Sequence, residues 1–194
     1  MSLNKFRNDR QRVVAIRRFA VSLPLLSIIC IGILTILSSY YEKSWTYNWS
    51  GINPSIKDSI KVAKITGITS GIGGMGRSTM DEVERRLWIM KTATESELLR
   101  LTEYPSGAVK AIAYEGLIRN ENFKDKANLI VEAINDKEYL VDYQMGCIGT
   151  RMEIGEYLMT FVLEFDRKFY PPSESRKFGI TENEKERILA IYRN

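Results

Sequence analysis

A glycine-rich loop is the segment of this sequence whose spacing comes closest to a known binding chemistry. Residues 71–78 read Gly-Ile-Gly-Gly-Met-Gly-Arg-Ser, which is the spacing of a phosphate-binding loop with arginine in place of the lysine and also fits G-x-G-x-x-G. A helix is expected to follow, and backbone N–H groups at the start of a helix can bind an anion. Both motifs need a buried parallel strand before the loop, whereas residues 61–67 are a mixed segment. We therefore expect the Gly71–Gly76 loop to connect two helices without binding a nucleotide.

Side chains that commonly act as bases, nucleophiles or metal ligands are scarce. The 194 residues include no histidine and two cysteines, Cys30 and Cys147. This composition excludes Ser-His-Asp and Cys-His catalysis and a cysteine-rich metal cluster. Cys147 is expected to be a buried small hydrophobe. We predict no catalytic residue, no metal ligand and no cofactor.

Carboxylates leave one enzymatic alternative open. A pair of Asp or Glu side chains can hydrolyse a glycosidic bond without histidine. The acidic residues fall on predicted solvated helix faces, as in residues 81–84 and 136–138. A glycan-acting envelope enzyme is therefore the alternative to a non-catalytic protein.

The basic residues are concentrated at the N-terminus. The chain has 28 Lys and Arg against 24 Asp and Glu, a net charge of +4. Residues 1–18 hold six basic side chains and one acidic, a net +5, and the remaining 176 residues hold 22 basic and 23 acidic. Because the body of the chain is nearly neutral, we expect no nucleic-acid partner.

An apolar run follows this basic tail. Residues 19–37 carry no charge, and as a helix rising about 1.5 Å per residue they would extend about 28 Å, close to the hydrocarbon thickness of a bilayer. A removable signal peptide and a buried core helix are the alternatives, but the run is longer than the usual signal-peptide core of about 7–15 residues. The sequence predicts one transmembrane helix over residues 19–39.

Residues typical of a membrane interface flank this run. Residues 40–53 form a predicted juxtamembrane aromatic segment, and a basic pair precedes the run. Because basic flanks stay in the cytoplasm, we expect a single-pass protein of the inner membrane, with a cytoplasmic tail at 1–18 and a periplasmic domain at 54–194. The predicted interface residues are Arg17, Arg18, Tyr40, Tyr41, Trp45 and Trp49.

The outer segment reads as an all-α domain of six or seven amphipathic helices. Asn53-Pro54 predicts a helix start, and capping boxes occur at residues 79–82, 94–97 and 181–184. In the helix after the first box, Met80, Val83, Leu87 and Met90 lie on one stripe, and Trp88 is expected in the core. Residues 139–152 are consistent with either an extended segment or a helix broken by glycine.

Residues 96–118 resemble a HEAT-type helical repeat. A helix with spaced leucines ends near Pro105, and Val109-Lys110 with Ala113 and Leu117 fits the second helix of such a repeat. The similarity covers residues 94–165, with residues 123–136 beginning the next unit, and extends to uncharacterised membrane-anchored envelope proteins of Bacteroidetes-type bacteria. The resemblance implies protein binding through a helix face or groove, not catalysis.

This resemblance and the helix geometry together suggest where a partner would bind. Lys110, Tyr114 and Ile118 share a stripe away from the predicted core, so they are the candidate protein-binding residues unless a further helix covers them. The expected function is a membrane-anchored, non-catalytic module of the cell envelope. Its partners would be the bilayer and another envelope protein, either a toxin effector bound by an immunity protein or a subunit of a secretion or motility complex.

Overall fold

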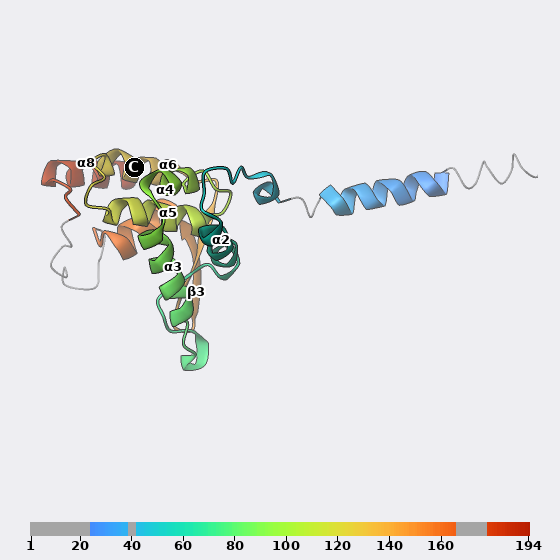
Figure 1. Cartoon of the computed structure of the whole chain (residues 1–194), viewed down its shortest axis with the longest axis horizontal. Coiled ribbons are helices and arrows are strands. Elements are labelled where there is room, and N and C mark those ends of the chain that lie inside the picture. The colour runs from blue at the N-terminus through green and yellow to red at the C-terminus, as the bar shows by residue number, and fades with distance from the viewer. Residues whose placement is uncertain (1–23, 39–41, 166–177) are drawn as a thin grey trace, which may run out of the picture. The chain divides into compact units, whose positions relative to one another are not determined.

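A computed structural model of the chain describes residues 24–38, 42–165 and 178–194 (Figure 1). The chain divides into two units, Met1–Trp45 and Thr46–Asn194. The predicted tail, Arg17, Arg18, Tyr40 and Tyr41 lie outside the described residues.

The first unit contains a helix over residues 24–38. Nine large apolar side chains on this helix are exposed, from Leu25 to Leu37. Among the residues that the structure describes, no helix combines the length and the apolar character needed to cross a membrane. The predicted span, residues 19–39, begins and ends outside those residues. Trp45 is exposed in the short 3-10 helix η1 (Lys43–Thr46).

The second unit is mostly helical. Its elements are α2 (Pro54–Thr66), η2 (Gly74–Gly76), α3 (Met80–Thr92), α4 (Glu95–Leu101), α5 (Gly107–Arg119), α6 (Lys126–Asn135), α7 (Ile154–Tyr157), the π-helix η3 (Leu158–Val162) and α8 (Glu182–Tyr192). The predicted caps at Asn53, Thr94 and Thr181 are confirmed, the last two as full capping boxes. Thr79 forms no cap hydrogen bond with α3, and its hydroxyl bonds to that of Thr69 instead.

A small sheet corrects the all-α prediction. β1 (Ile68–Thr69) pairs in parallel with β2 (Leu140–Met145), which pairs antiparallel with β3 (Ile148–Glu153). The stretch 139–152 is thus a hairpin, and its two-residue turn begins with Gly146 at φ 60°, as such turns prefer. Val141 and Tyr143 alternate with exposed neighbours and face the core.

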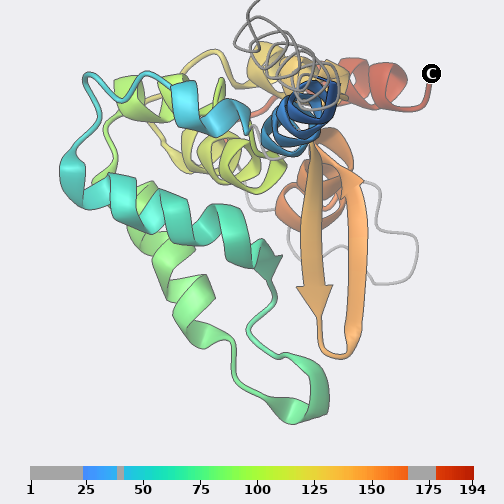
Figure 2. The same ribbon diagram turned by 90° about the vertical axis from the view of Figure 1, so that its right-hand side faces the viewer.

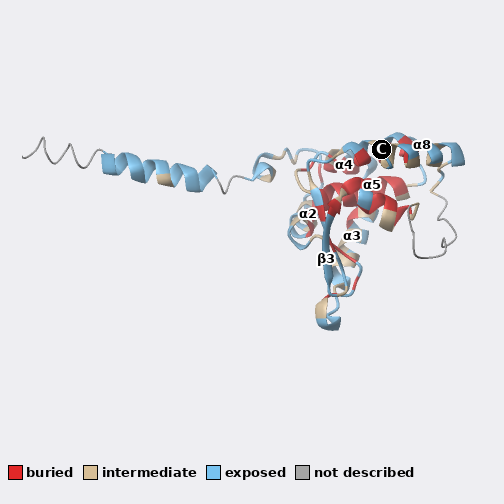
Figure 3. Ribbon diagram, turned by 180° about the vertical axis from the view of Figure 1, so that it is seen from behind, coloured by how far each residue is buried: buried red, intermediate tan, exposed pale blue. Residues whose placement is uncertain are grey.

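Helix α5 is the centre of the second unit (Figure 3). It contacts α2, α3, α4, α6, α7, η3 and β2, and twelve of its thirteen residues are buried. Its first residue is Gly107, where a Cβ atom would lie 2.1 Å from the carbonyl oxygen of Leu140. Only glycine therefore allows the start of α5 to lie this close to β2.

Trp49, one of the predicted membrane-interface residues, packs against Tyr47 and Tyr104 at the edge of the domain core. Helices α4 and α5 lie on either side of the turn at Tyr104-Pro105. The next unit is not completed by a second helix, because the strand β2 follows α6.

Candidate protein-binding site

The apolar stripe of α3 is only partly covered by the rest of the domain. Ile89 is the one buried residue of α3. Leu87 is 50% exposed and Met80 47%, while Val83 and Met90 are partly buried. Trp88 is 40% exposed, so its predicted place in the core is wrong. An apolar helix face left open in this way is a common feature of protein interaction surfaces.

A groove of about 520 Å³ runs beside this stripe, and we call it the α3–α5 groove. Its apolar lining comes from the end of α3, from α4 and from α5, and its polar lining includes two basic side chains. The lining residues are Leu87, Met90, Lys91, Ala93, Leu98, Gly116, Arg119 and Asn120. A Cβ atom at Gly116 would lie 3.1 to 3.2 Å from Leu98 and Met90, so this glycine allows the three helices to meet beneath the groove.

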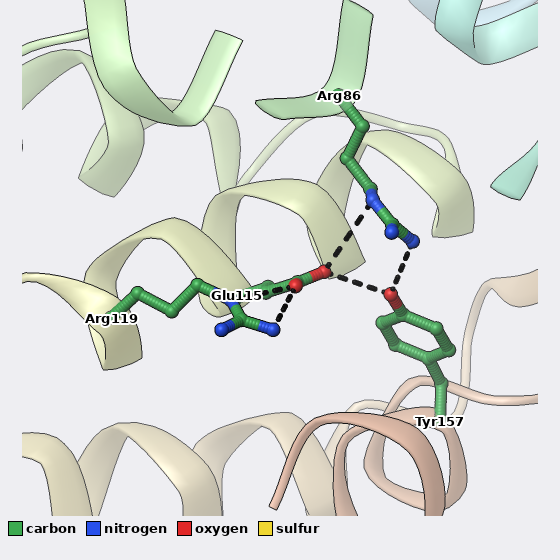
Figure 4. A network of polar contacts seen from close by, with 4 residues as sticks. All are labelled: Arg86, Glu115, Arg119 and Tyr157. Atoms are coloured by element: carbon green, nitrogen blue, oxygen red, sulfur yellow. Dashed lines mark hydrogen bonds and ion pairs between the residues drawn. The ribbon is translucent and has the colours of Figure 1, made fainter. Parts of the chain in front are cut away.

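A buried ionic network links α3 to α5 and α7 (Figure 4). Glu115 of α5 accepts hydrogen bonds from Arg119 Nε at 2.8 Å and from the Tyr157 hydroxyl at 2.8 Å. Arg86 of α3 donates from Nη1 to the Tyr157 oxygen at 3.0 Å, and its Nε lies 3.9 Å from Glu115 Oε2. The four side chains thus join α3, α5 and α7.

Opposite charges and hydrogen bonds hold the side chains of this network together. Glu115 is buried and lies between two guanidinium groups, Arg86 and Arg119. Burial, followed by the nearby Glu115 carboxylate, raises the pKa of Tyr157 well above its ordinary value, so the phenol stays protonated and donates a hydrogen bond. The Nε of Arg86 is buried without a hydrogen-bond partner, and Arg119 reaches the groove lining.

The predicted binding stripe on α5 is wrong, because its side chains are buried. Lys110, Tyr114 and Ile118 are all covered. Lys110 forms an ion pair with Asp136 at the end of α6, and the Tyr114 hydroxyl donates to Glu132 at 3.3 Å. Burial and the nearby Glu132 raise the pKa of Tyr114. A signal was available in the sequence, since α5 carries small or apolar residues on every side, which is typical of a fully buried helix.

The glycine loop has a setting closer to a phosphate loop than the sequence suggested. A strand, β1, does precede it, and that strand is parallel to β2. Several backbone N–H groups of the loop nevertheless donate within the chain: Gly71 to the Thr69 hydroxyl, Gly73 to the Arg77 carbonyl and Thr79 to the Gly71 carbonyl. The loop is closed by an antiparallel bridge between Ile72 and Ser78. These N–H groups are therefore not directed at an anion.

Cysteine and metal chemistry add no site in the described part of the chain. Cys147 is exposed in the hairpin turn, so its predicted burial is wrong. Within residues 24–38, 42–165 and 178–194, no cluster of three His, Cys, Asp or Glu side chains is placed to hold a metal ion. The candidate site is therefore the α3–α5 groove with the adjoining α3 stripe. Comparisons of the chain with protein-family models, with curated proteins and with solved structures found no match.

Proposed function

We propose that this chain is a membrane-anchored, non-catalytic protein-binding module of the bacterial cell envelope, and that its partner occupies the α3–α5 groove. The observation that carries the proposal is the exposed apolar face of α3 beside that groove, with Leu87 at half exposure on both. Domains seldom leave a contiguous apolar helix face in water unless a partner covers it.

The charges around the groove indicate the chemistry of the partner. Lys91 and Arg119 are among its lining residues, whereas no carboxylate is. A partner segment with apolar side chains flanked by Asp or Glu would complement this surface. Trp88, the residue after Leu87 of the stripe, adds an aromatic side chain of the kind that often dominates binding energy.

The anchor rests on the first unit. A helix over residues 24–38 that exposes nine large apolar side chains requires an apolar environment. Together with the basic residues before it, this supports a single-pass protein of the inner membrane with its N-terminus in the cytoplasm and its domain in the periplasm. The HEAT-like pair α4 and α5 would then present the groove to a toxin effector or to a subunit of an envelope complex.

Affinity purification from native membranes tests the proposal. The full-length protein, Leu87→Asp and Ile65→Asp would be purified in parallel, with mass spectrometry of the proteins that accompany each. Ile65 is 83% exposed on α2, outside the groove, so its variant is the matched control. We expect one envelope protein to accompany the wild type and Ile65→Asp and to be lost from Leu87→Asp. Recovery of the protein alone, or equal recovery with all three, would contradict the proposal.

Topology has a separate test. A protease added outside intact spheroplasts should degrade the chain from about residue 42 onward and spare the basic tail. Protection of the domain from the external protease would place it on the cytoplasmic side and overturn the proposed orientation.

A further inference from the structure

The glycine loop and the turn of the β2–β3 hairpin form one end of the second unit (Figure 2). The Gly146 N–H in the hairpin turn donates to the Ile72 carbonyl in the loop at 2.9 Å. We call residues 72–78 and 145–148 together the paired tip. Because the loop is also closed by the bridge from Ile72 to Ser78, the paired tip is a defined structure.

The paired tip exposes apolar side chains from both of its segments. Ile72, Met145 and Ile148 are more than half exposed, and Met75 is 99% exposed. Cys147 is exposed between the last two. Residues 65–76 and 143–150 contain no charged side chain, and Arg77 is the one charge within the tip. An exposed apolar cluster without interspersed charges is unusual for a surface in contact with water alone.

The backbone holds the most exposed of these side chains in an unfavourable conformation. Met75 has φ 57°, in the left-handed region that non-glycine residues seldom occupy. Its neighbours are Gly74 and Gly76, and its side chain is almost wholly in solvent. No packing within the domain accounts for a methionine at this position, and such conformations concentrate at functional sites.

We propose that the paired tip inserts into the surface of a lipid bilayer. This inference rests on the proposed membrane anchor. The second unit follows that anchor in the same chain, so the anchor would keep it near a bilayer surface.

The composition of the paired tip favours lipid over a protein partner. Methionine and isoleucine side chains on a small glycine-rich loop can enter the acyl region without a shaped pocket. Arg77 stands at the base of the loop, where its long side chain would extend toward lipid phosphate. Because the contact is hydrophobic, it should occur on neutral lipid and change little with salt.

Fluorescence at Cys147 tests this proposal in the full-length protein. Cys30→Ser leaves Cys147 as the one thiol, which would carry an environment-sensitive fluorophore after reconstitution into phosphatidylcholine vesicles with or without brominated lipid. We expect a blue-shifted emission, quenching by the brominated lipid and little change in 1 M salt. Met75→Asp with the same label should reduce quenching by about tenfold, because one apolar anchor becomes charged.

A label placed far from the paired tip supplies the control. Glu186 is exposed on α8, so Glu186→Cys in a Cys30→Ser, Cys147→Ser background should give water-like, unquenched emission. Flotation of the vesicles separates the two proposals. Protein that does not float with the vesicles contradicts the anchor. Protein that floats but leaves the Cys147 label unquenched, or that shields it only after a partner protein is added, overturns insertion of the paired tip and leaves the anchor standing.

Discussion

Helices α3 and α5 are each thirteen residues long and each carry apolar side chains at helical spacing, yet they differ in how much of each helix is buried. Twelve residues of α5 are buried and one of α3 is. The difference lies in the charges. Six residues of α3 are charged, against three of α5, and the three on α5 all have partners: Lys110 with Asp136, and Glu115 with Arg119. An apolar stripe alone predicts that a segment is helical. The number of charged side chains on the other faces of the helix indicates how much of the helix is buried.

The largest effect should come from breaking the contact between the two helices at Glu115. Glu115→Gln removes the one carboxylate and leaves Arg86 and Arg119 facing each other in a mostly buried site. Removing one partner of a buried ion pair typically costs about 3–5 kcal/mol. Urea unfolding of the full-length protein in detergent, followed by tryptophan fluorescence, would measure the loss.

Glu84→Gln is the control for this substitution. Glu84 is exposed on α3, so its change should alter the free energy of unfolding by no more than about 0.5 kcal/mol. Equal effects of the two variants would mean that the network does not join α3 to α5.

The same leucine truncation made in each helix sharpens the comparison. Leu117 on α5 is fully buried, so Leu117→Ala should destabilise the domain by about 2–5 kcal/mol. Leu87 on α3 is half exposed, and Leu87→Ala should cost less than about 1 kcal/mol while weakening partner binding. If Leu87→Ala were as destabilising as Leu117→Ala, the groove would belong to the domain core and not to a binding surface.

A glycine at the start of α5 supplies the next smaller effect. Gly107→Ala would place a Cβ atom against the backbone of β2, and overpacking of this kind typically costs about 1–3 kcal/mol. Gly74→Ala adds the same atom where nothing lies within 4 Å, so it should be close to neutral. Thermal unfolding of both variants would compare them directly. A neutral Gly107→Ala would mean that α5 is free to move away from the sheet.

The parts of the fold that depend on residues close together in the sequence were predictable. Thr94 and Thr181 begin helices because each bonds within its own first turn, and that pattern is visible in four residues. The sequence did not distinguish the hairpin at 140–153 from a helix broken by glycine. Each of its strands has six residues, and so short an alternation of apolar and polar side chains is compatible with either structure. Gly146 as the first residue of a two-residue turn was the available signal for it.

The candidate site depends on contacts that local pattern does not contain. The stripe of Lys110, Tyr114 and Ile118 was a candidate because it lies on a face away from the predicted core of α5. That face is covered, and α6 and its C-cap supply partners for Tyr114 and Lys110. The groove was missed for the converse reason. Leu87 and Met90 read as core residues, and only the positions of α4 and α5 reveal that they line an open surface.

The smallest effect concerns pH and the tyrosine that joins α7 to both helices. The pKa of Tyr157 is raised above the ordinary 10.0, chiefly by burial and then by Glu115. The native state therefore keeps a proton that the unfolded chain releases, and this stabilisation is present below pH 10 and is lost as the pH rises further. Each such group contributes at most about 1.4 kcal/mol per pH unit.

The free energy of unfolding, measured from pH 8 to 11, should fall above pH 10, and it should fall less steeply in Tyr157→Phe. At neutral pH this substitution should also cost about 1–3 kcal/mol, because the hydrogen bonds of the hydroxyl are lost. Tyr114 has a raised pKa as well, so part of the slope should persist in the variant. If the dependence of the unfolding free energy on pH were the same in Tyr157→Phe as in the wild type, the Tyr157 hydroxyl would ionise as readily in the folded domain as in the unfolded chain. The network that joins α3, α5 and α7 would then be open to water.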